Sequence, residues 1–139
     1  MIALTEEMKA ALGTSLADGN PVMVASALAS GVPDIVFKGS VMVWDTEHLA
    51  YWERAHGQTE RALKENPNVC LLYRNPSARK AWKFFGVAEL HPGGELRDAV
   101  MARTVQAELD RDPERKGTAV IIRVDKVIEM GQVIMQREA

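Results

Sequence analysis

Short apolar runs separated by turn residues make up most of the chain, a spacing typical of β-strands. The runs are rich in β-branched and aromatic residues, which favour strands. Strands are predicted at 22–28, 34–44, 48–53, 69–73, 81–90, 118–124 and 133–135. The segment 34–44 is interrupted at Lys38-Gly39, where a glycine indicates a bulge or a close approach of two backbones. Short turns join the first three runs, which predicts a hairpin that continues as a meander.

Two short helices are predicted, one before the first strand and one between the strands 48–53 and 69–73. The first begins after Thr5, a residue suited to capping, and ends at Gly13. The second covers 57–65 and ends at Asn66-Pro67, because the residue before a proline disfavours helical geometry.

A third and longer helix is predicted at 95–109, where strong helix formers follow one another. Its apolar side chains fall into two groups, one with Leu96 and Val100 and the other with Met101 and Leu109. A helix with two apolar sides needs two surfaces to pack against. The sequence therefore predicts that a second copy of the chain covers part of the apolar surface.

Strands that arrive in consecutive hairpins predict an antiparallel sheet. About six of them in one short chain can remove exposed edges by curling into a barrel. The fold class is therefore mainly β with peripheral helices, and residues 1–139 are predicted to form a single domain.

Composition narrows the function classes. Hydrophobic residues make up 47% of the chain and charged residues 26%, a composition typical of a globular protein. The net charge of -2 provides no strong positive field that would attract nucleic acids or anionic membranes. Cys70 is the only cysteine, which excludes an internal disulfide and suits a reducing compartment. The first residues include Glu6 and Glu7 rather than the basic start of a signal peptide, and no run approaches the ~20 apolar residues of a membrane span. We therefore expect a cytoplasmic protein.

The most informative stretch for chemistry is 51–59, where a strand passes through Gly57 into a helix. Free amides at a helix start and the positive end of the helix dipole favour a phosphate. Gln58 and Thr59 add neutral donors, and Arg54 and Lys38 are the nearest cations. The alternative interpretation is a solvated corner with incidental charges.

Other candidate residues are less specific. The basic run 74–80 indicates either a solvated turn or a positive rim around an anionic ligand. Trp52 and Trp82 lie on predicted strands, where aromatic residues are mostly core or interface. The histidines lack the spacing of a helical metal site and no serine has the context of a nucleophile, so no metal site is predicted and a cofactor would perform any reaction.

The succession of segments resembles the pyridoxamine 5'-phosphate oxidase-like family of FMN-binding split barrels. The resemblance covers roughly residues 16–127 and is carried by segments 38–43, 48–54, 57–59, 66–74, 78–89 and 112–117. It implies a homodimer with two flavin mononucleotide (FMN) sites at the subunit interface. By position, Lys38, Ser40, Arg54, Gln58 and Thr59 would hold the phosphate, Val41, Met42, Trp52 and Glu53 would border the ring system or ribityl chain, and Arg79, Lys80 and Trp82 would approach from the second subunit.

Two departures from the family pattern bear on the activity. True pyridoxamine phosphate oxidases have a basic phosphate-binding triplet and a C-terminal Arg and His cluster, whereas this chain has Gly57-Gln58-Thr59 and 136–139 at those places. The resemblance therefore implies a related FMN-dependent oxidoreductase with another small-molecule substrate. Two alternatives stay open: an FMN-binding carrier or sensor without catalysis, and the same barrel binding a deazaflavin or haem.

Overall fold

The computed structural model describes residues 1–138 and confirms a mainly β fold with helices at its periphery. The strands are β1 (Val22–Ala27), β2 (Pro33–Lys38), β3 (Met42–Asp45), β4 (His48–Glu53), β5 (Asn68–Asn75), β6 (Lys80–His91), β7 (Thr118–Glu129) and β8 (Gln132–Gln136). The helices are α1 (Glu6–Gly13), α2 (Gln58–Glu65), α3 (Glu95–Arg103) and α4 (Gln106–Leu109). The sheet has 8 strands rather than about six, because the predicted run 34–44 forms two strands and the short predicted run 133–135 forms β8.

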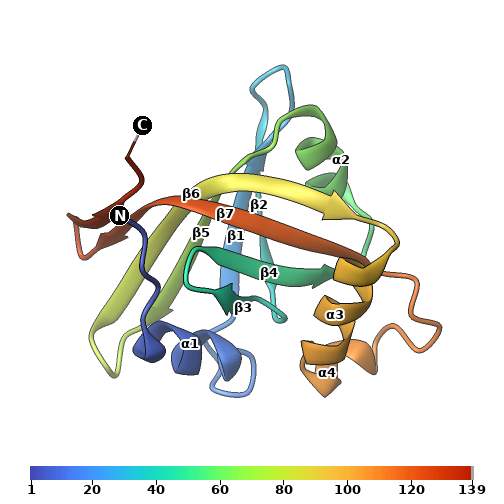
Figure 1. The fold of residues 1–139 in the computed structure, drawn as a ribbon, viewed down its shortest axis with the longest axis horizontal. Helices are drawn as coiled ribbons and strands as arrows, with labels where there is room; N and C mark the ends of the chain where they lie inside the picture. The colour runs from blue at the N-terminus through green and yellow to red at the C-terminus, as the bar shows by residue number, and fades with distance from the viewer. Residues whose placement is uncertain (139) are drawn as a thin grey trace.

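The sheet is antiparallel and its order is β2-β1-β5-β6-β7-β4-β3, with β8 paired to β7. The predicted hairpin of β1 and β2 is confirmed, from Val22 opposite Lys38 to Ala27 opposite Pro33. The predicted meander is wrong, because β3 pairs with β4 at the far end of the sheet and β4 pairs with β7. In Figure 1, β6 and β7 cross the front of the curled sheet, while β1 and β2 lie behind.

Gly39 lies at the crossing between β2 and β3. A Cβ atom on Gly39 would lie 2.5 Å from Glu108 Oε1 and 3.0 Å from the Leu16 side chain. The atoms that approach Gly39 belong to side chains, and not to a second backbone as the sequence predicts, and they do so where the chain leaves one end of the sheet for the other.

Two groups of buried side chains hold the fold together. The larger group fills the inside of the curled sheet and is closed by side chains of α1 such as Met8 and Leu12. The smaller group lies on the outer face of β3, β4 and β7 and includes Trp52. Helices α3 and α4 cover this outer face through Val100 and Leu109. Burying one such side chain stabilises the fold by about 1.5–3 kcal/mol, so β4 is fixed from both sides.

The predicted helix 95–109 is interrupted. Thr104 and Val105 have extended ψ angles of 139° and 138°, and the Thr104 hydroxyl donates to the Val100 carbonyl at 2.8 Å. The break turns side chains from both predicted groups, Val100 and Leu109, toward the same face of the sheet. One packing surface therefore serves them, and the helix no longer argues for a second copy of the chain.

Among residues 1–138, no helix combines the length and apolarity that crossing a lipid bilayer demands.

Candidate functional site

The corner between β4 and α2 is the place where the sequence predicts an anion site. Gly57 caps α2 without a side-chain hydrogen bond. The amides of Gly57, Gln58 and Thr59 donate to no acceptor within residues 1–138. Because these amides point out of the positive end of a helix, they can bind an anion.

The loop before α2 is held by an internal carboxylate. Glu53 Oε2 accepts hydrogen bonds from the amides of Ala55 at 3.1 Å and His56 at 3.3 Å. The Glu53 side chain is fully buried, and Lys38 Nζ lies 3.0 Å from both of its oxygens. Lys38, only 13% exposed, therefore acts as the counter-ion of Glu53 and ties the end of β2 to the end of β4.

Arg54 has a carboxylate partner and free donors. Its Nε atom lies 2.6 Å from Oε2 of Glu108, which is buried at the edge of α4. The two terminal nitrogens of Arg54 have no partner within residues 1–138. A guanidinium in this state can still donate two parallel hydrogen bonds to a phosphate or carboxylate.

His56 stands just before the start of α2, where both of its ring nitrogens face acceptors. Its Nδ1 lies 2.6 Å from Glu60 Oε2 and its Nε2 lies 2.9 Å from the Lys116 carbonyl oxygen. Burial alone would lower the pKa of His56, but these acceptors outweigh it and raise the pKa above its ordinary value. When protonated, the ring neutralises Glu60, the one acidic residue in the first turn of α2.

Ser40 and Trp52 form the frame of the corner. The Ser40 hydroxyl accepts from the Trp52 amide at 2.9 Å and donates to the Trp52 carbonyl at 3.2 Å. The Trp52 ring is 2% exposed, its Nε1 donates to Asp112 Oδ2 at 2.9 Å, and the Arg97 guanidinium lies 4.9 Å from its centroid. Val41 and Met42 are buried as well. These side chains support the site from inside the fold.

Asp112 fixes the loop that approaches Trp52 from the side of β7. Burial raises the pKa of Asp112. Hydrogen bonds from the Lys116 amide, the Trp52 indole and the Gly117 amide lower the pKa by more than burial raises it, so the net pKa lies below the ordinary value. A charged Asp112 thus holds residues 112–117 against β4.

Arg79, Lys80 and Trp82 lie elsewhere in the same chain. Trp82 is 1% exposed, stacks on Tyr73 with centroids 5.3 Å apart, and donates to Glu129 Oε1 at 2.7 Å. Lys80 and Arg79 stand at the β5–β6 turn. Strand β5, with 8 residues and a length of roughly 26 Å, lies between this turn and the end of α2. Figure 1 shows this turn at the lower left and α2 at the upper right. The structure does not bring these residues to the corner within one chain.

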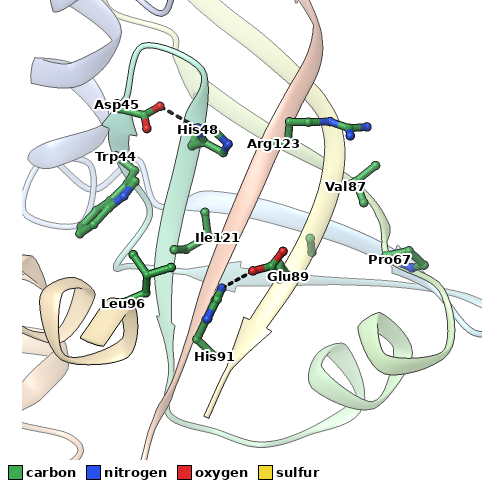
Figure 2. A pocket seen from close by; sticks show the side chains of 11 residues that line it. Trp44, Asp45, His48, Pro67, Val87, Glu89, His91, Leu96, Ile121 and Arg123 are labelled. Atoms are coloured by element: carbon green, nitrogen blue, oxygen red, sulfur yellow. Dashed lines mark hydrogen bonds and ion pairs between the residues drawn. The ribbon is translucent and has the colours of Figure 1, made fainter. Parts of the chain in front are cut away.

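A cavity of about 600 Å³ lies on the outer face of β4, β6 and β7, and none of the predicted site residues lines it. Figure 2 shows that His48, His91 and Arg123 border it together with apolar side chains. His48 Nδ1 lies 2.8 Å from Asp45, and Arg123 pairs with Asp125. His91 Nε2 lies 2.6 Å from Glu89 Oε1, an ion-pair distance without the alignment of a hydrogen bond. Each basic side chain thus faces a carboxylate.

Sequence reasoning missed Glu108, Asp112 and the contact of His56 with the Lys116 carbonyl oxygen. The partners in these contacts lie 54–60 residues apart in the chain, and no local pattern indicates such pairs. The cavity was missed for the same reason, because His48 and His91 come together only through the pairing of β4, β6 and β7.

The fold and this corner define a split-barrel protein with free amide donors at the start of α2. The family profile described as pyridoxamine 5'-phosphate oxidase matches residues 4–130, so the chain belongs to the pyridoxamine 5'-phosphate oxidase family. Among curated proteins, none matches the chain.

Solved structures share the fold. A protein of Lactobacillus delbrueckii, described as a candidate pyridoxamine 5'-phosphate oxidase, is 26% identical with a TM-score of 0.72, over 92% of this chain and 95% of that one. HupZ of Group A Streptococcus is 23% identical with a TM-score of 0.73, over 97% and 99%. An FMN-binding protein of Syntrophomonas wolfei is 13% identical with a TM-score of 0.65, over 90% of each chain.

The same fold carries other cofactors. An F420 reductase is 17% identical with a TM-score of 0.62, over 90% and 98% of the two chains. A haem-binding protein of Mycobacterium smegmatis is 16% identical with a TM-score of 0.64, over 98% of this chain and 59% of that one. These two likenesses concern the fold alone.

Proposed function

We propose that this protein is an FMN-binding oxidoreductase whose cofactor phosphate binds at the start of α2. The observation that carries the proposal is the set of free amides at Gly57, Gln58 and Thr59, which follow Arg54 by three to five residues, together with the free terminal nitrogens of Arg54. Such donors fit a phosphate monoester, and haem carries no phosphate group. The FMN-binding relative in the same fold supports this choice.

The proposal uses only part of the residue set that the resemblance implies. Arg54, Gly57, Gln58 and Thr59 hold the phosphate. Lys38 and Ser40 are already engaged, with Glu53 and Trp52 respectively, and they keep the corner in shape. When bound, FMN would supply hydride or electron transfer, while the protein binds the cofactor, orients it and shields it from water.

A homodimer is part of the proposal. Strand β2 is an edge of the sheet, and Val32 before it and Ile35 and Phe37 on it are 52%, 60% and 68% exposed. Large apolar side chains on an edge strand favour pairing with another chain. A second subunit would close the open side of the corner and could bring Arg79 and Lys80 to the cofactor. We also propose a cytoplasmic location, which suits the single cysteine Cys70.

The phosphate contribution can be measured by comparing FMN with riboflavin, which lacks the phosphate. We expect FMN to bind the protein more tightly than riboflavin in a fluorescence titration. Gln58→Glu should weaken FMN by about tenfold, because a charge at a helix start contributes up to ~2 kcal/mol. Gln132→Glu on β8, an exposed site, is the matched control and should change nothing. Equal affinities for FMN and riboflavin would contradict a phosphate site at the start of α2.

Catalysis and simple binding differ in what reduces the cofactor. An oxidoreductase should be reduced by NADH, NADPH or a small substrate under anaerobic conditions, with bleaching of the flavin absorption. Bound FMN that none of these reduces quickly would favour a carrier or sensor. A deazaflavin band or a Soret band in the absorption spectrum of the purified protein would show that the barrel binds a deazaflavin or haem in place of FMN.

A further inference from the structure

We propose that Glu108 is a positioning residue that holds Arg54 with its two terminal nitrogens free for the phosphate. This inference rests on the proposed function and names the residue that sets the preference of the site for a phosphorylated flavin. Glu108 takes only the Nε atom of Arg54, at 2.6 Å. The guanidinium fork has two edges, and the occupied Nε leaves the edge formed by Nη1 and Nη2.

The place of Glu108 is built by the fold. The residue is 8% exposed, and its Oε1 atom lies in the space left by the missing side chain of Gly39. The carboxylate therefore stands between the β2–β3 crossing and the loop that leads to α2. Arg54 is half-buried, at 32% exposure, and without this carboxylate its long side chain would be free to sample other rotamers.

Charge could also act against the phosphate, because Glu108 is an anion near an anion site. Two features argue that orientation prevails. The Arg54–Glu108 contact neutralises the carboxylate locally, and fixing an arginine in advance lowers the entropy lost when a ligand binds. The two effects predict different FMN affinities for a variant with a neutral side chain of the same shape. Glu108→Gln removes the charge and keeps an oxygen that accepts from Nε, so orientation predicts little change and repulsion predicts tighter binding.

The readout is the ratio of the riboflavin and FMN dissociation constants, which reports the phosphate contacts and not general folding. We expect Glu108→Ala to lower this ratio by about tenfold and Glu108→Gln to keep it near that of the wild type. Gly39→Ala should also lower the ratio, because its Cβ would displace Glu108 Oε1, a side-chain end that can move, while the Leu16 methyl groups at 3.0 Å shift by a few tenths of an ångström. Riboflavin affinity should stay unchanged in each variant.

A double-mutant cycle separates this inference from the proposed function. In an Arg54→Ala background, Glu108→Ala should change the ratio no further, since the residues act through one contact. If the wild type prefers FMN and Arg54→Ala abolishes much of that preference, but Glu108→Ala alone does not, the positioning role is overturned while the phosphate site stands. A rise of the ratio in Glu108→Gln would also overturn it. A wild type without preference for FMN would refute the proposed function itself.

Discussion

Replacing Lys38 by methionine tests whether this lysine is an internal counter-ion of the fold. The change leaves the Glu53 carboxylate fully buried with no cation in contact, because Lys38 Nζ is the cation that lies 3.0 Å from it. At that separation two unit charges attract by about 5.5 kcal/mol with an effective dielectric constant of 20. Breaking a buried pair by removing one partner costs about 3–5 kcal/mol. Glu53→Gln should cost less, since Lys38 is 13% exposed and can reach water.

The two changes should be coupled. Lys38→Met/Glu53→Gln removes both charges, and the Gln side chain can still accept from the Ala55 and His56 amides. We therefore expect the double variant to be more stable than Lys38→Met alone by about 2 kcal/mol. Urea unfolding at pH 7 and constant protein concentration, followed by tryptophan fluorescence, gives the three unfolding free energies. A loss below about 1 kcal/mol in Lys38→Met, or strict additivity in the double variant, would refute the counter-ion role.

Gly117→Ala places a Cβ atom onto the Trp52 indole and should lower the unfolding free energy by about 1–3 kcal/mol, with a red-shifted tryptophan emission; an unchanged melting temperature and spectrum would contradict the close packing there. His56 has a raised pKa in the folded protein, so its stabilisation is complete below its ordinary pKa of 6.5 and is lost as the pH rises through the folded value. Wild-type stability should therefore fall more steeply than that of His56→Gln as the pH rises above 6.5 in urea unfolding, and parallel curves would contradict the contacts of the ring with Glu60 and the Lys116 carbonyl.

Local patterns were enough to predict most strands and the first two helices. Thr5 accepts from the Met8 amide at 3.1 Å, as its capping role predicts, and the β1–β2 hairpin has the expected turn. These features depend on neighbours in the chain. The fold class follows from the same patterns together with the family resemblance.

Pairing between distant strands could not be predicted in the same way. The extended segment 34–44 gives no sign of which strand β3 joins, and the choice of β4 and β7 as neighbours depends on the packing of the whole sheet. The break falls on two β-branched residues, Thr104 and Val105, which lower helix propensity only slightly, so the good helix formers on either side hid it and the packing against the sheet decides.

The candidate site shows the same division. The loop around Gly57 was predicted from a glycine at a helix start, and the structure provides the free amides that this pattern implies. The charges of Lys38 and Arg54 were recognised, but their carboxylate partners Glu53 and Glu108 were not, since charge pairing depends on contacts across the fold.

A crystal structure of the protein grown with FMN would locate the cofactor phosphate. We expect two subunits with FMN between them, and phosphate oxygens within hydrogen-bond distance of the Gln58 and Thr59 amides and the terminal nitrogens of Arg54. FMN bound with its phosphate away from the start of α2, or a corner that stays without FMN at saturating concentration, would contradict this expectation.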